Sequence, residues 1–255
     1  MYYNVLGGLS RQGNANSNTV NISGGDIKVD VQGGYSLSGL ANGNTVNISG
    51  GTIQREVYGG LSQSGSANSN TVNISGGDIK VDVQGGYSLS GLANGNTVNI
   101  SGNPTFGVTT ILYGGYKVFG TGDVFTNNTL NIKTKNITAK DIANFEFINL
   151  YLLDSTKAND TILKVNDAIT FGGSNTKLNV SALNGINLNF NIGDSIILIS
   201  IATSIDTPKL IISNTSFQAS SLAHIYNFDI TSEAQAINAT LKQTILLKKH
   251  YPSLA

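Results

Sequence analysis

The residues best suited to chemistry are two aspartates, Asp26 and Asp30, with Lys28 between them. An alternating strand over residues 26–31 would place both carboxylates on one outer face, where such a pair can serve glycoside cleavage or Ca²⁺ binding. The pair is duplicated, however, and a catalytic pair needs one preorganised pocket, so a solvated strand face is the favoured interpretation. The duplicate comprises Asp78, Lys80 and Asp82, and the repeat between the two has Thr52, Gln54 and Glu56 at the matching positions.

Tyrosines gather at or beside Gly-Gly pairs, which we expect to form chain corners because glycine tolerates positive φ. Aromatic rows can stack on sugar rings or contact a protein partner, and they can also simply cover a corner. Among the surface features of this chain they are the best candidates for contact with a partner or glycan. The candidate residues are Tyr35, Tyr58, Tyr87, Tyr113 and Tyr116.

Asparagine, threonine and serine recur in a fixed order and predict polar rows along a repeated surface. The triplet Thr19, Asn21 and Ser23 returns at each repeat, and a regular hydroxyl array can bind ice or sugar. Stacked amides pair well with one another, which favours a structural ladder. A second set begins each strand and predicts an amide ladder at a corner: Asn18, Asn44, Asn70 and Asn96.

The remaining catalytic and metal-binding residue types are sparse. His224 and His250 are the only histidines, and a catalytic base or metal ligand needs convergent partners that their neighbourhoods do not supply. The chain contains no cysteine. We therefore predict no catalytic residue, no metal and no cofactor, and we expect His224 to lie on a strand face.

The elements that must position these side chains follow from an internal repeat. Residues 15–50 return unchanged as residues 67–102, an offset of 52 (67 − 15). This offset divides into two units of 26 residues that differ in sequence, as the spacing of Asn18 and Asn44 shows (44 − 18). A fixed period of this length is typical of stacked coils. The sequence predicts an all-β fold, a right-handed parallel β-solenoid with coils of about 26 residues.

Each unit reads as two alternating strands. In residues 19–23, Val20 and Ile22 point inward, and in residues 26–31 we expect Ile27, Val29 and Val31 to do so. Gly24-Gly25 and Gly33-Gly34 are the expected corners. Arg55 then falls on an inward position, which requires a bulge or a shifted parity. The predicted inner ladders are Val20, Val46, Val72 and Val98, beside Ile22, Ile48, Ile74 and Ile100.

The repeat decays after Gly102. A Gly-Gly pair returns at Gly114, 29 residues after Gly85 (114 − 85), and residues 128–132 follow Asn96 by 32 (128 − 96), which indicates a fifth, degenerate coil. Later strands are longer and more apolar, as expected of an end that must cover open sheet edges. We expect residues 1–135 to form the repeat solenoid and residues 136–255 its continuation and a more hydrophobic, less regular cap.

Composition excludes some partners. Charged residues make up 12% of the chain, with 15 basic and 15 acidic side chains, so no basic field attracts nucleic acid. No apolar stretch reaches the length of about 18 residues that a membrane helix needs, and no signal peptide is visible. Since the chain starts in the middle of a repeat, we expect it to be a fragment or a truncated product.

The NTVNISGG units followed by GGYS resemble the repeated passenger regions of bacterial autotransporters, the surface proteins of type V secretion. Residues 144–151, 161–163 and 192–199 resemble the segment that precedes the membrane barrel of that family. The resemblance implies a β-helical passenger, without signal peptide or barrel, displayed on the cell surface, associated with the outer membrane or secreted. It implies a non-enzymatic role in adhesion, aggregation or display.

The expected partner is a host or bacterial surface receptor or a glycan, with self-association possible and no membrane insertion. Two other functions stay open. A β-helical polysaccharide lyase or hydrolase would need a unique charged cluster, although Arg11 and Arg55 are the only arginines. An ice-binding solenoid would be favoured by threonine rows on one flat exposed face.

Overall fold

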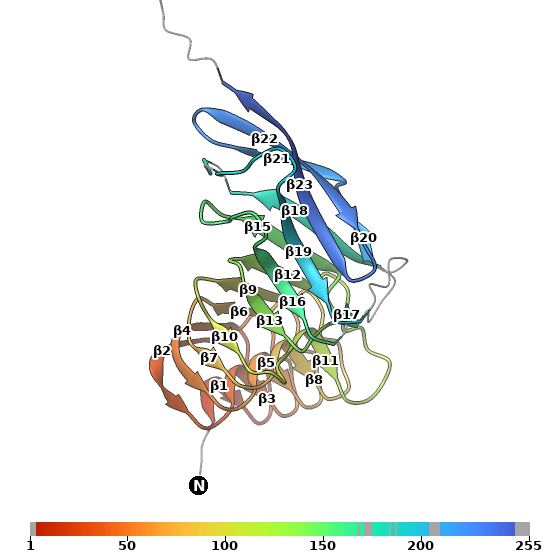
Figure 1. Cartoon of the computed structure of the whole chain (residues 1–255). Coiled ribbons are helices and arrows are strands. Elements are labelled where there is room, and N and C mark those ends of the chain that lie inside the picture. Colours follow the sequence, from red (N-terminus) through yellow and green to blue (C-terminus); the bar gives the residue numbers. More distant parts are fainter. Residues whose placement is uncertain are drawn as a thin grey trace, which may run out of the picture.

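The chain folds into a stack of parallel β-coils in a computed structural model that describes residues 4–167, 169–170, 175–183, 185–186, 188–203 and 210–247. Those residues form strands, turns and loops and no helix, and thus no helix among them could cross a membrane. Successive coils lie one on another along the axis of the molecule (Figure 1). The expected all-β parallel solenoid with coils of about 26 residues is confirmed.

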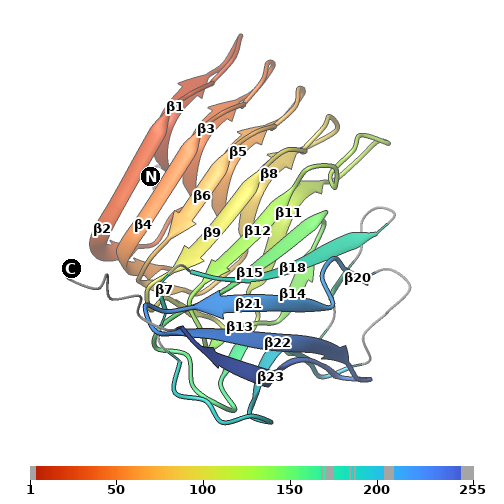
Figure 2. The same cartoon turned by 90° about the horizontal axis from the view of Figure 1, so that it is seen from above.

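One side of the solenoid is a seven-stranded parallel sheet, here called the tyrosine sheet, to which each successive coil adds one strand. The view in Figure 2 shows its first strands side by side. Val31, Val57 and Val83 lie opposite one another in adjacent strands, so equivalent residues of each repeat form straight columns. In spatial order the strands are β1 (Val5–Ser10), β3 (Val31–Ser36), β5 (Val57–Ser62), β8 (Val83–Ser88), β11 (Ile111–Lys117), β14 (Asp141–Ala143) and β17 (Ile169–Thr170).

A ten-stranded sheet, here called the asparagine sheet, forms a second side. Its strands are also parallel, with Thr45 opposite Thr71 and Val46 opposite Val72. The strands are β2 (Thr19–Ile27), β4 (Thr45–Ile53), β6 (Thr71–Ile74), β7 (Asp78–Ile79), β9 (Thr97–Ser101), β10 (Thr105–Phe106), β12 (Thr129–Lys133), β15 (Phe147–Leu152), β18 (Thr176–Ala182) and β20 (Leu210–Ile212).

A third, six-stranded sheet starts in the second half of the chain and closes that end of the stack. Its first three strands are parallel coil strands, whereas the last three are antiparallel hairpin strands, as Figure 1 shows in blue. Antiparallel pairing turns the chain back on itself and stops the addition of coils. The strands are β13 (Ile137–Ala139), β16 (Thr161–Val165), β19 (Ser195–Ile201), β23 (Ala236–Leu246), β22 (His224–Ser232) and β21 (Ser216–Ser220).

The core consists of the inner columns that the alternation predicts. Val46, Val72 and Val98 are fully buried, and Ile48 and Ile74 are 1% exposed. The columns stay in register from coil to coil, with Val72 opposite Val98 and Ile74 opposite Ile100. Like residues therefore stack on like, and both predicted inner ladders are confirmed.

The fifth coil also keeps the register. Tyr116 lies opposite Tyr87 and Thr129 opposite Thr97, despite the longer spacing in sequence. The additional residues lie in the connections between strands, where extra length does not disturb the ladder. The prediction of a degenerate fifth coil is confirmed.

Of the two predicted corners, Gly24-Gly25 is supported by a positive φ of 90° at Gly25 and at its equivalent Gly77, where bends separate β6 from β7. The second corner lies elsewhere than predicted. Gly33-Gly34 is inside β3, and the chain turns at residues 28–30, between β2 and β3. Consequently Val29 is only half-buried and Arg55 is exposed, so neither a bulge nor a parity shift is needed. The glycines serve close packing instead: a Cβ on Gly34 would lie 2.3 Å from the Ala15 carbonyl oxygen and 2.6 Å from the amide of Asn44.

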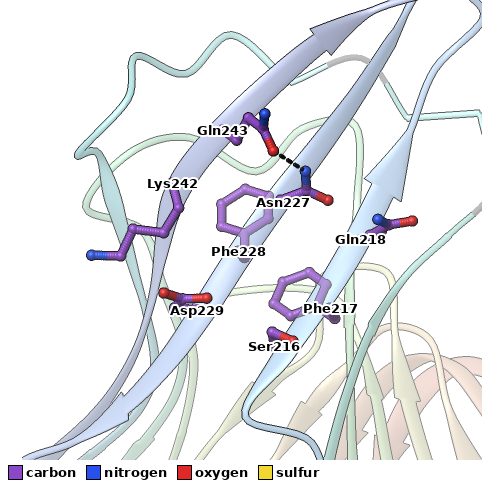
Figure 3. A pocket seen from close by; sticks show the side chains of 8 residues that line it. All are labelled: Ser216, Phe217, Gln218, Asn227, Phe228, Asp229, Lys242 and Gln243. Atoms are coloured by element: carbon purple, nitrogen blue, oxygen red, sulfur yellow. Dashed lines mark hydrogen bonds between the residues drawn. The ribbon is translucent and has the colours of Figure 1, made fainter.

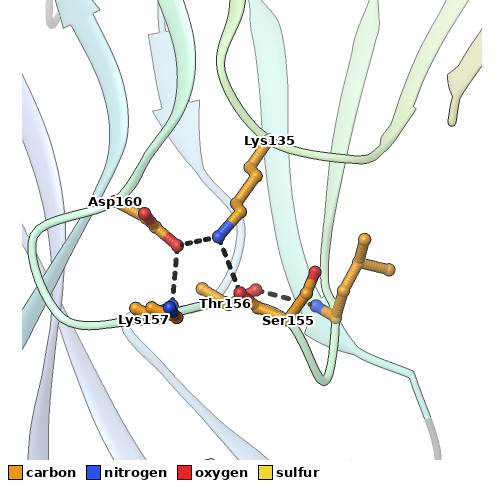
Figure 4. A network of polar contacts seen from close by, with 6 residues as sticks. Lys135, Ser155, Thr156, Lys157 and Asp160 are labelled. Carbon is orange, nitrogen blue, oxygen red and sulfur yellow. Dashed lines mark hydrogen bonds and ion pairs between the residues drawn. The ribbon is translucent and has the colours of Figure 1, made fainter. Parts of the chain in front are cut away.

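A lysine fastens the loop between β15 and β16. Lys135 Nζ lies 2.5 Å from Asp160 Oδ2 and donates to the Ser155 carbonyl at 2.6 Å (Figure 4). Asp160 Oδ2 also accepts from the Lys157 backbone N–H at 2.7 Å. Where the sequence repeat has decayed, a specific ion pair thus holds two connections together.

Candidate functional site

The five candidate tyrosines lie on the outer face of the tyrosine sheet, within its strands and not at corners as predicted. They belong to two neighbouring columns that run along the solenoid axis. The first column comprises Gln32, Tyr58, Gln84 and Tyr113, and the second comprises Tyr35, Leu61, Tyr87 and Tyr116. All five tyrosines are half-buried, so part of each residue is available to solvent.

Four of the rings form one continuous cluster. Tyr58 meets Tyr87 edge to face at a centroid distance of 5.4 Å, and Tyr87 stacks on Tyr116 at 5.6 Å. Tyr113 meets Tyr116 edge to face at 5.0 Å. Such pairs hold the rings in fixed orientations and lower the entropy lost when a partner binds.

Tyr35 stands apart from that cluster because Leu61 separates it from Tyr87 in the column. Its hydroxyl accepts a hydrogen bond from Gln63 Nε2 at 2.6 Å. A surface groove of about 270 Å³ opens here. It is lined by Asn4, Asp30, Gln32, Tyr35, Tyr58, Leu61, Gln63, Tyr87 and Leu89.

Gln32 and Gln84 flank Tyr58 in the first column and are 3% and 5% exposed. The Oε1 atom of each is buried and receives no hydrogen bond from the part of the chain that the structure describes. A buried acceptor without a donor costs free energy, on the order of 1–3 kcal/mol. Gln32 also lines the groove, together with Tyr35 and Tyr58.

A column of carboxylates borders the tyrosines. Asp30, Glu56 and Asp82 each precede a strand of the tyrosine sheet, and the backbone N–H groups of Val31 and Val57 bond to the carbonyls of Glu56 and Asp82. Burial raises the pKa of Asp30, and the neighbouring Glu56 raises it further. Burial likewise raises the pKa of Asp82, although the N–H of Ile111, at 2.8 Å, acts in the opposite direction.

Arg55 counters this negative charge. Its Nε lies 3.4 Å from Asp30 Oδ1 and 3.5 Å from Glu56 Oε2. Burial also raises the pKa of the Tyr58 and Tyr87 hydroxyls, and that of Tyr113 to about 12. The face therefore presents neutral phenols beside carboxylates that already have partners.

The predicted carboxylate pair does not exist as a pair. Asp26 lies in β2, whereas Asp30 follows the corner and borders the tyrosine sheet, because the strand ends at Ile27. Asp26 instead pairs with Lys28 at 3.6 Å and accepts from Gln54 Nε2 at 2.5 Å. In the second copy, Asp78 pairs with Lys80 and accepts from the Thr105 hydroxyl.

Among the described residues, no cluster of acidic and histidine side chains is placed to hold a metal ion.

The asparagine sheet carries the predicted polar rows on its outer face. Asn47 Nδ2 donates to Asn21 Oδ1 at 2.8 Å, and the same bond continues from coil to coil. The full ladder comprises Asn21, Asn47, Asn73, Asn99, Asn131, Asn149 and Asn179. Beside it, five threonines lie in register: Thr19, Thr45, Thr71, Thr97 and Thr129.

The predicted corner ladder of asparagines is confirmed, but it lies inside the solenoid against the glycine pairs. Asn44, Asn70 and Asn96 are fully buried. Asn70 Oδ1 accepts from both the backbone N–H and Nδ2 of Asn44, at 2.9 and 3.0 Å. The ladder thus explains why the adjacent strands need glycine.

Two further hollows lie near the cap. One of them lies over β21–β23 and has a volume of about 600 Å³. There Phe217 and Phe228 stack with ring centroids 5.0 Å apart, and Asn227 Nδ2 donates to Gln243 Oε1 (Figure 3). A smaller one of about 250 Å³ is lined by Gly185, Leu222 and His224, among others.

His224 begins β22, as expected of a strand residue, whereas His250 lies outside the described residues.

Comparison with known proteins does not add a relative: a scan of protein-family models, a search of curated proteins and a search of solved structures each found no match. The geometry adds Gln32, Leu61, Gln63 and Asp30 to the tyrosines named from sequence. A signal for them exists in the sequence, since alternate repeats read VQGGYS and VYGGLS. That alternation places different residues in adjacent positions of one column.

Proposed function

We propose that this chain is a non-enzymatic binding protein whose solenoid displays the tyrosine sheet to a partner at a bacterial surface. The observation that carries the proposal is the cluster of Tyr58, Tyr87, Tyr113 and Tyr116 in register on a parallel sheet. Tyrosine supplies a large amphipathic contact area at a low entropy cost, which suits recognition of receptors and glycans. The role is adhesion, aggregation or display.

The bacterial surface is part of the proposal because the NTVNISGG and GGYS units resemble autotransporter passengers. A β-solenoid suits such a passenger, since each coil adds length without a change in the binding face. The partner would be a host or bacterial surface receptor or a glycan. Self-association of the displayed solenoids is a related outcome of the same role.

Attachment of coated beads tests the function. Beads carrying the chain should adhere to epithelial or bacterial cells, or to one another. A variant with Tyr58, Tyr87, Tyr113 and Tyr116 all replaced by serine should lose adhesion, because it removes the ring cluster. Tyr151→Ser is the matched control, since Tyr151 lies in β15 on the asparagine sheet. Equal adhesion of both variants would contradict a role for the tyrosine sheet.

A polysaccharide lyase or hydrolase has weaker support from the geometry. Asp26 and Asp30, the pair that suggested such chemistry, border different sheets and each has a cationic partner. Release of reducing sugars or unsaturated products from polysaccharides measures this activity directly. Turnover that is lost in Asp30→Asn would replace the binding proposal with an enzymatic one.

Ice binding is a second candidate because the threonine row of the asparagine sheet lies in register on one outer face. Thr19 is exposed and the next four threonines are half-buried beside the amide ladder. Thermal hysteresis that disappears in Thr71→Tyr would support this function. A melting–freezing gap of zero at about millimolar protein would exclude it.

A further inference from the structure

We propose that the groove between Tyr35 and Tyr87 binds a neutral saccharide. The inference deepens the proposed function, on which it rests, by naming the ligand class and the place of contact on the tyrosine sheet. It depends on the shape of the groove, on an acceptor that lacks a donor, and on charges that are already paired.

The shape of the groove comes from the alternation of two kinds of coil. Strands β3 and β8 both read VQGGYS, whereas β5 between them reads VYGGLS. In the second column, Leu61 therefore replaces the tyrosine found on either side, and Tyr35, Leu61 and Tyr87 all line one hollow. In the first column the reverse exchange places Tyr58 beside that hollow. A uniform repeat would have produced continuous rows and no groove.

One polar side chain of the groove has an acceptor without a donor, and a ligand with hydroxyl groups carries donors. Gln32 lines the groove, is 3% exposed, and has a buried Oε1 to which no described residue donates. Sugar hydroxyls are donors, and the C–H face of a sugar ring packs against aromatic rings such as those of Tyr35 and Tyr87. Gln63, already bonded to the Tyr35 hydroxyl, adds a second amide at the rim.

The charges favour a neutral ligand. Asp30, the one carboxylate in the lining, is paired with Arg55 at 3.4 Å, and Glu56 is paired with the same arginine at 3.5 Å. An anionic ligand would face these carboxylates, so phosphates and acidic glycans are disfavoured. A quaternary ammonium could use the rings, but it has no hydrogen to donate to Gln32.

The experiment uses the whole chain and defined probes. Saturation-transfer NMR and calorimetry are run with cellohexaose, maltohexaose and hexa-N-acetylchitohexaose, and with tetramethylammonium, which has no donor, as the cationic alternative. Leu61→Tyr fills the hollow with the residue that the neighbouring coils carry, and Gln32→Leu removes the acceptor. Leu9→Tyr and Gln84→Leu are matched controls, because they make the same exchanges in the same columns outside the groove lining.

We expect at least one hexasaccharide to bind, with affinity about tenfold weaker in Leu61→Tyr and Gln32→Leu and within about twofold of the unchanged chain in the two controls. Circular dichroism confirms that all four variants are folded. Three results would overturn the inference: none of the hexasaccharides binds, tetramethylammonium binds and loses affinity in Leu61→Tyr, or all four variants weaken saccharide binding equally.

Bead adhesion measured on the same proteins separates the two proposals. Adhesion that persists without any saccharide binding overturns the saccharide site and leaves the adhesive function standing. Saccharide binding without adhesion supports the site and contradicts the adhesive function. Loss of both in Leu61→Tyr, with both retained in Leu9→Tyr, supports the two together.

Discussion

Asn131 Nδ2 donates to Asn99 Oδ1 at 2.8 Å across 32 residues of chain, and Asn73 makes the same bond to Asn47 at 2.7 Å across 26. Later steps of the ladder span 18 and 30 residues with bonds of 2.8 and 2.7 Å. The geometry of the coil stack is thus conserved within the molecule after the sequence period is lost. The loops absorb the difference in length, because only the strands share the ladder.

The buried ladder should matter more for stability than the outer one. Asn70→Ala removes the acceptor of two hydrogen bonds and leaves the Asn44 backbone N–H and amide buried without it. We expect the free energy of unfolding to fall by about 2–4 kcal/mol. Asn47→Ala on the half-exposed outer ladder should cost about 1 kcal/mol. Urea unfolding measures both, and equal losses would contradict the distinction.

The glycine pairs should be intolerant of a methyl group where the ladder packs on them. In Gly60→Ala the new Cβ would lie 2.3 Å from the Ala41 carbonyl oxygen and 2.6 Å from Asn70 Oδ1. We expect a loss of about 3 kcal/mol or more. Gly24→Ala is the control, since a Cβ there meets nothing within 4 Å. Similar thermal unfolding temperatures of the two variants would contradict this prediction, because they would mean that the strands move apart to accommodate the methyl group.

Glu56→Gln should lower the pKa of Asp30. Burial is the largest cause of the raised pKa and remains in the variant, but the hydrogen bond and charge of Glu56 also raise it. A carboxyl whose folded pKa exceeds its ordinary 3.8 binds its proton more tightly when folded, so it reduces stability as pH rises through that window. The variant should weaken this dependence. Carboxyl NMR titration and unfolding between about pH 3 and 7 test it, and an unchanged Asp30 pKa would contradict the coupling.

The ion pair of Lys135 should stabilise the irregular second half. Lys135→Met removes the partner of Asp160 and the donor to the Ser155 carbonyl. We expect a loss of about 1–2 kcal/mol, because both side chains are largely buried. Lys133→Met is the control: its amine lies 5.2 Å from the Tyr151 ring centre and is exposed, so its loss should cost under about 1 kcal/mol. Denaturant unfolding that ranks the two variants in the opposite order would refute this role.

Much of the fold could be predicted because residues one repeat apart in the sequence lie side by side in adjacent coils. The alternation around Val20 and Ile22, repeated at a constant interval, identified the inner columns correctly. It did not place the tyrosines, which were expected at corners and lie within strands of the tyrosine sheet. The repeat did identify the fifth coil from a short match at residues 128–132, since an amide ladder tolerates changes in the loops.

The sequence by itself therefore determined the coil period, the inner ladders and the residue types on the outer faces. Only the tertiary structure decided where the chain turns, because a Gly-Gly pair suits both a corner and a strand against which another side chain packs. The position of Asn44 against Gly34 resolves that ambiguity. Once the corner lies at residues 28–30, Asp26 and Asp30 separate. The groove depends in turn on Tyr35, Leu61 and Tyr87 being stacked in one column, a proximity between coils that no local pattern contains.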